Sequence, residues 1–121
     1  MAKTYFISGY GNATEDDFKA HYEEKVFKAI NEDALFVVGD YDGLDLVAQR
    51  YLKAMMVTNV TVYHMGEEPK RNVGFRTVGG FLSHEERDGA MTISSDEDIA
   101  WVRPDDKTSC TFKNIQRRKS L

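Results

Sequence analysis

Three aspartates follow the most hydrophobic segment of the chain, which spans residues 34–38. Carboxylates in such a turn can accept hydrogen bonds from ribose hydroxyls, hold a divalent cation or stabilise an oxocarbenium-like transition state. Helix capping by Asp42 and dipole compensation by Asp45 would explain two of the three, but not Asp40. The turn is therefore favoured as a functional site, with Asp40 and Asp45 as candidate catalytic groups. Its candidate ligand contacts are Gly39, Asp42 and Gly43.

A phosphate group fits better elsewhere, because carboxylates at a helix start repel it and the turn lacks the Gly-x-Gly-x-x-Gly spacing. The segment Ser109-Cys110-Thr111 offers small hydroxyl side chains and free amides at the start of the last predicted helix. Ser109 and Thr111 are therefore candidate ligand contacts. N-capping by Ser109 explains the serine equally well, and both roles are compatible.

Two further segments are candidate contacts. In Ser8-Gly9-Tyr10, glycine lets the backbone approach a ligand while Tyr10 stacks on a base, although a tight strand-to-helix turn needs glycine anyway. Arg87, Asp88 and Met91 should share one face of the helix that starts at Ser83. Arg87 could bind a carboxylate or phosphate there, but an ion pair with a neighbouring acid explains the same spacing. For each of the two segments, the ligand-binding interpretation and the structural interpretation both stay open.

Several other chemistries have no basis in the sequence. The three histidines are scattered and Cys110 is the one cysteine, so no zinc-ligand spacing exists. Neither a nucleophile-elbow motif nor a nucleoside-triphosphatase loop is present. We expect no metal and no cofactor.

Strands and helices alternate along the chain. Apolar runs and helical periodicity predict strands at 5–7, 34–38, 60–64 and 98–102, with helices at 14–31, 44–55, from Ser83 and from Ser109. Such alternation implies right-handed crossovers. We therefore expect one Rossmann-like three-layer α/β domain over residues 1–121, with a mostly parallel sheet of about four strands and helices on both faces. Ligands of such sheets bind beyond the carboxyl ends of the strands, where the crossovers change face.

The segment 66–82 has no steady period and is long for a loop, which is typical of functional or mobile loops. Its apolar side chains, together with the small sheet, predict a homo-oligomer. These side chains are Val73, Phe75, Val78 and Phe81.

Composition limits the partners. The 121 residues carry a net charge of −4, and the one basic cluster, Arg117-Arg118-Lys119, ends a predicted helix. We therefore do not expect nucleic acid as a partner. A single cysteine favours a reducing compartment, and no apolar stretch is long enough to cross a membrane. We expect a cytoplasmic protein without membrane contact.

Three motifs stand out together: Ile7-Ser8-Gly9-Tyr10; Val37-Val38-Gly39-Asp40 with Gly43, Asp45 and Ala48; and Asp98-Ile99-Ala100-Trp101-Val102 with Pro104, leading into Ser109 and Thr111. In this combination the chain resembles the SLOG superfamily of Rossmann-like proteins, in its YspA-like branch. The superfamily includes lysine-decarboxylase-like phosphoribohydrolases and sensors of nucleotide-derived ligands, and is distantly similar to nucleoside deoxyribosyltransferases. Many close relatives are small bacterial or phage proteins.

The resemblance implies ligand contacts at Ser8, Gly9 and Tyr10 and in the aspartate turn. The phosphate-binding Gly-Thr of the enzymes falls on Cys110-Thr111, where cysteine replaces glycine. Their catalytic glutamate falls on Asn114, which is a candidate ligand contact here because an amide cannot act as that carboxylate does. This departure favours binding over catalysis.

Two main hypotheses follow. The first is binding or sensing of a nucleotide or nucleotide-derived small molecule at the carboxyl ends of the strands. The alternative is an N-glycosidase or glycosyl transferase acting on a nucleoside or nucleotide, with an aspartate as the catalytic group. A third option is an interaction protein assembled through segment 66–82.

Overall fold

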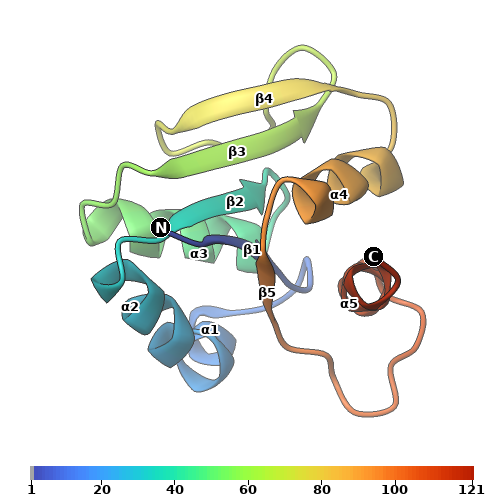
Figure 1. Cartoon of the computed structure of the whole chain (residues 1–121), viewed down its shortest axis with the longest axis horizontal. Helices are drawn as coiled ribbons and strands as arrows, with labels where there is room; N and C mark the ends of the chain where they lie inside the picture. Colours follow the sequence, from blue (N-terminus) through green and yellow to red (C-terminus); the bar gives the residue numbers. More distant parts are fainter. Residues whose placement is uncertain (1) are drawn as a thin grey trace.

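A five-stranded parallel sheet forms the centre of the fold in the computed structural model, which describes residues 2–121 (Figure 1). The strand order is β4-β3-β2-β1-β5. The strands are β1 (Thr4–Ser8), β2 (Leu35–Gly39), β3 (Val60–Met65), β4 (Arg76–Phe81) and β5 (Glu97–Ala100). The predicted α/β class with a parallel sheet is confirmed.

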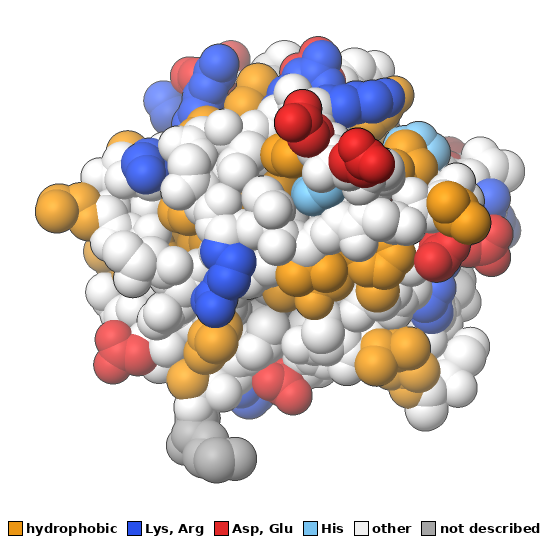
Figure 2. Space-filling view, turned by 90° about the horizontal axis from the view of Figure 1, so that it is seen from above, with side chains coloured by type: hydrophobic (Ala, Val, Ile, Leu, Met, Phe, Trp, Pro, Cys, Tyr) orange, Lys and Arg blue, Asp and Glu red, His pale blue; other side chains and the backbone are white. Residues whose placement is uncertain are grey.

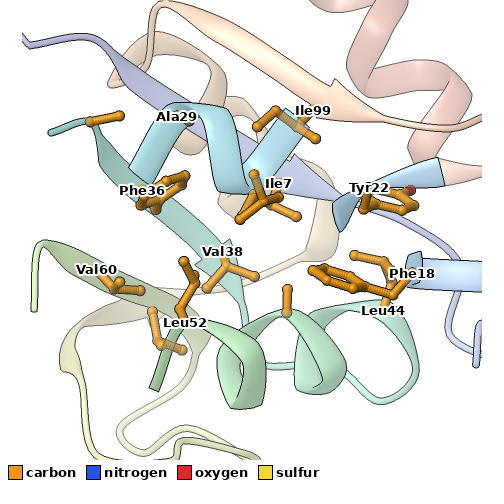
Figure 3. Close-up of a cluster of buried hydrophobic side chains, with 14 of the residues drawn as sticks. Ile7, Phe18, Tyr22, Ala29, Phe36, Val38, Leu44, Leu52, Val60 and Ile99 are labelled. Atoms are coloured by element: carbon orange, nitrogen blue, oxygen red, sulfur yellow. The ribbon is translucent and has the colours of Figure 1, made fainter. Parts of the chain in front are cut away.

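Helices cover both faces of the sheet, as predicted. One layer consists of α1 (Glu15–His21), α2 (Glu23–Asn31) and α3 (Leu44–Ala54), and the other of α4 (His84–Ile93) and α5 (Cys110–Lys119). Alternate residues of the central strands supply the two cores: Ile7 and Val38 pack in the first layer with Leu44, whereas Phe6 and Val37 pack against Met91 of α4. Figure 3 shows the larger core, where aromatic and branched side chains from the strands pack against those from the helices. Among residues 2–121, the helices are all too short or too polar to cross a membrane.

The prediction of about four strands missed β4. This strand lies within segment 66–82, and its residues from Arg76 to Gly80 are all exposed, so no burial pattern marks it in the sequence. It pairs in parallel with β3 after a connection that contains no helix. The sheet therefore has five strands.

The connection before β4 is anchored to the core by a buried glutamine. Gln49 of α3 donates from Nε2 to the carbonyl of Arg71 and accepts from the amide of Val73, at 3.1 Å each, and the ring of Phe75 is buried. The buried amide therefore holds the chain in place where a crossover helix is absent.

The single helix predicted at 14–31 is interrupted. Thr14 caps its start, but Tyr22 leaves helical geometry (φ −126°, ψ −42°) and separates α1 from α2. The buried Tyr22 hydroxyl donates to the carbonyl of Ser8 (2.7 Å) and accepts from the amide of Trp101 (3.0 Å). These bonds tie the junction of the two helices to the ends of β1 and β5.

Candidate functional site

A polar cleft of about 290 Å³ opens at the carboxyl ends of β1 and β2. The chain leaves β1 through α1 and α2 toward β2, whereas β5, on the other side of β1, is reached through α4 on the opposite face. The crossovers thus change face between β1 and β5, which is where open α/β sheets bind ligands. The cleft lies at the place that the sequence predicted.

Most of the predicted site residues meet in this cleft. Those that line it are Ser8, Gly9, Tyr10, Gly39, Asp45, Arg87, Ser109, Thr111 and Asn114. Three predicted residues lie outside the lining, namely Asp40, Asp42 and Gly43. The structure therefore joins four separate segments and divides the aspartate turn.

The hydroxyl of Ser8 is buried in the floor of the cleft without a partner. In the described part of the chain, its Oγ is the one buried side-chain nitrogen or oxygen atom that makes no hydrogen bond. Ser8 is 6% exposed and lines the cleft. Leaving a buried hydroxyl unsatisfied costs about 1–3 kcal/mol, so this atom is suited to meet a polar ligand atom.

Arg87 and two carboxyl groups form a buried cluster along one wall. Arg87 Nη1 contacts Asp40 Oδ1 at 3.1 Å, and its Nε and Nη2 contact Asp88 Oδ1 at 3.1 Å. The second oxygen of Asp40 accepts from the amide of Lys70 at 2.8 Å. Asp40 therefore positions Arg87 and the connection before β4, behind the cleft surface.

Asp45 is buried with fewer partners. Its Oδ2 accepts from the amide of Tyr41 at 3.2 Å. Burial raises the pKa of the Asp45 carboxyl to about 7. The positive charge of Arg87 and the hydrogen bond from Tyr41 oppose this rise. The negative charges of Asp88 and Asp40 add to it. Asp45 can therefore hold or release a proton near neutral pH.

The glycines of this turn make room for other groups. A Cβ on Gly39 would lie 2.5 Å from Asp45 Oδ2 and 3.4 Å from the Arg87 guanidinium carbon. Gly43 has φ +67°, and a Cβ there would meet the backbone of Gly11 at 2.4 Å. The missing side chain of Gly39 thus leaves room for Asp45 and Arg87 beside the end of β2, whereas Gly43 serves the turn before α3.

Asp42 lies on the surface. Its side chain is 61% exposed and 3.8 Å from Arg71, and its Oδ1 accepts from the amide of Gly43 at 2.9 Å. These contacts make it a local turn residue.

The start of α5 forms the opposite wall. Thr111 and Asn114 are buried there, and Ser109 caps the helix by accepting from the amide of Phe112 at 3.0 Å. Asp106 lies just before this helix, and hydrogen bonds from Ser109, Tyr10 and Thr108 hold the pKa of its carboxyl well below the usual range. One anionic group is thus already stabilised next to this helix start.

Tyr10 joins that wall to the first loop. Its hydroxyl donates to Asp106 and accepts from the amide of Arg103 at 2.8 Å. The Arg103 guanidinium lies 4.1 Å from the centre of the Tyr10 ring, so one face of the ring is covered. A base that stacks on Tyr10 must therefore use its other face or displace Arg103.

Sequence reasoning missed three polar lining residues, Tyr41, His84 and Asp88. The rings of Tyr41 and His84 meet edge to face at 5.7 Å. Asp88 follows Arg87 on a helix, and the shared face was a signal that pointed to it. Within residues 2–121, no three His, Cys, Asp or Glu side chains come close enough together to hold a metal ion.

The fold and the cleft define a Rossmann-like α/β protein with a polar cleft at the point where the crossovers change face. Comparison of the chain with protein-family models, with curated proteins and with solved structures found no match.

Proposed function

We propose that the cleft binds a nucleotide or a nucleotide-derived small molecule, and that the protein acts as a binding or sensing domain. The cleft has the volume of a small-ligand site, and its lining combines many polar side chains with a few apolar ones. Its place at the carboxyl ends of β1 and β2 agrees with the way such sheets bind nucleotides. The SLOG resemblance supports the same proposal, since its Ser8, Gly39 and Thr111 motifs meet in this cleft.

The unpartnered hydroxyl of Ser8 carries this proposal. A folded protein rarely leaves a buried polar atom unsatisfied, and here that atom belongs to a residue in the floor of the cleft. A ligand hydroxyl, phosphate oxygen or ring nitrogen would satisfy it.

The two walls of the cleft differ in charge, and this difference determines the orientation in which we expect the ligand to bind. Asp45 and Asp88 supply acceptors that suit ribose hydroxyls or base amino groups. The start of α5, with Ser109 and Thr111, suits a phosphate, although Asp106 beside it must be accommodated. We therefore expect the sugar or base beside the aspartates and the phosphate beside α5.

A thermal-shift screen against nucleosides, nucleotides, ADP-ribose and nicotinamide dinucleotides tests the proposal. Binding to the native state raises the melting temperature by mass action. The Ser8→Ala variant should lose most of that rise, because the ligand loses its buried partner, while Ser120→Ala, outside the cleft, should keep it. No rise with any compound, or an equal rise in Ser8→Ala, contradicts the proposal.

An N-glycosidase or glycosyl transferase is the second candidate, and the raised pKa of Asp45 favours it. A carboxyl group with a pKa of about 7 in a cleft is suited to general acid or base catalysis. Mass spectrometry of each stabilising compound after incubation separates the two functions. Free base that disappears with Asp45→Asn supports catalysis, whereas an intact compound and weaker binding by Asp45→Asn support the sensor.

We also propose that the protein forms a homo-oligomer and is cytoplasmic. Of the four side chains predicted to mediate self-association, Phe75 is buried and Val73 packs against the core. Val78 is 40% exposed and remains available for contact.

A further inference from the structure

The outer edge of the sheet at β4 is open. Within residues 2–121, β4 pairs only with β3, and each residue from Arg76 to Gly80 is exposed. The strand contains no proline and no lysine, and its one charged residue is Arg76 at its start. An edge strand without such protection is a template for another strand.

The opposite edge is protected. β5 has four residues and begins with Glu97 and Asp98. Arg118 of α5 contacts Asp98 at 3.0 Å and also donates to the backbone carbonyl of Ser95 at 2.8 Å. These contacts hold α5 next to this edge. In the described chain, the β4 edge is therefore the less protected of the two edges of the sheet.

We propose that a second copy of this chain pairs with β4 in antiparallel orientation, which joins the two sheets into one. This inference rests on the proposed self-association and is independent of ligand binding. A two-fold axis at Val78 places each Val78 opposite its counterpart and Arg76 opposite Gly80 of the second copy. Figure 2, which views the molecule from above β4, shows apolar side chains exposed across the middle of this face.

Charge favours a second copy as the partner. The backbone of Gly66 bonds to Gly80 and Phe81, so the exposed Glu67 and Glu68 follow directly at the Gly80 end of the edge. The proposed pairing brings Arg76 of each copy toward these glutamates of the other, twice across the axis. Within residues 2–121, no ion pair involves Arg76, Glu67 or Glu68.

The backbone limits the extent of pairing. Gly80 has φ +89°, which ends regular strand geometry. The shared ladder therefore spans Arg76 to Gly80 at most, and the small interface predicts a dimer that dissociates on dilution.

Sedimentation velocity over a dilution series from high to low micromolar concentration tests the inference. The intact chain should sediment as a dimer of the 13.8 kDa chain at high concentration. Val78→Lys sets two like charges opposite each other and should raise the dissociation constant by about a hundredfold. Val78→Thr, which keeps a branched uncharged side chain, should dimerise normally.

A charge exchange tests the register. Arg76→Glu should yield monomers, and its combination with Glu67→Lys and Glu68→Lys should restore the dimer. Circular dichroism melting confirms that each variant is folded. A dimer that neither Val78→Lys nor Arg76→Glu weakens overturns the β4 interface alone, whereas a monomeric intact chain at every concentration overturns self-association as well.

Discussion

Asp40 and Asp45 stand five residues apart, both are buried, and the sequence assigned them the same candidate role. In the structure, both oxygens of Asp40 are engaged, by Arg87 and by the amide of Lys70. Asp45 accepts one backbone hydrogen bond and its pKa is raised by burial. The difference shows that burial alone does not make a carboxyl group available to a ligand, because the complete pairing of Asp40 makes it a structural element.

The local fold explains the difference. Asp40 directly follows β2, where it meets α4 and the connection before β4. Asp45 is the second residue of α3 and lies beside the cleft, next to Gly39. The same turn therefore places the Asp40 carboxyl among buried structural contacts and the Asp45 carboxyl in the lining of the cleft.

The largest effect expected from this comparison is the loss of stability in Asp40→Ala. The change removes one of the two carboxylates that pair with the buried Arg87 and leaves the Lys70 amide without its acceptor, which costs about 4 kcal/mol. Urea unfolding at neutral pH measures it. An equal loss in Asp45→Ala would break the comparison, because the two carboxyl groups would then be equally structural.

A smaller effect concerns the pH dependence of Asp45. Its pKa is 3.8 when unfolded and about 7 when folded, so between these values the folded state holds a proton that the unfolded state has released. Stability should fall as the pH rises through this window and level off above about 7. Between about pH 5 and pH 8, this group should lower the free energy of unfolding by about 3 kcal/mol.

Asp45→Asn removes that contribution, since asparagine does not titrate. Urea unfolding at several pH values should give a flatter profile for the variant, with its largest gain over the intact protein above neutral pH. An unchanged slope would show that another group carries the pH dependence and that Asp45 is not the proton-holding group.

The sequence predicted the architecture because hydrophobic runs and stripes are clear in the elements that the core buries. The run at β2 and the apolar stripe of α3 are buried in the core, and both elements lie where they were expected. β4 gave no such signal, because an edge strand exposed on all of its first five residues needs no hydrophobic alternation. Tyr22 looked like one more apolar position of a long helix, and its buried hydrogen bonds depend on β1 and β5.

The lining of the cleft was predictable at the level of segments but not at the level of individual atoms. Fold topology brings the ends of β1 and β2 to the starts of α4 and α5, which follows from alternation alone. Which oxygen of which aspartate finds a partner depends on distant residues such as Arg87 and Lys70. The orphaned hydroxyl of Ser8 and the cover of Arg103 over Tyr10 likewise arise only when the chain is folded.

The smallest effect sharpens the comparison with the third aspartate of the turn. Asp42→Asn removes a charge that is exposed and 3.8 Å from Arg71, and the new amide oxygen can still accept from the Gly43 amide. Exposed pairs of this kind contribute little, so stability should change by less than about 0.5 kcal/mol. The ligand-induced thermal shift should also stay the same, since Asp42 lies outside the cleft lining. A loss of that shift with stability intact would mean that the turn reorganises on binding and brings Asp42 to the ligand, which would return the whole aspartate turn to the site.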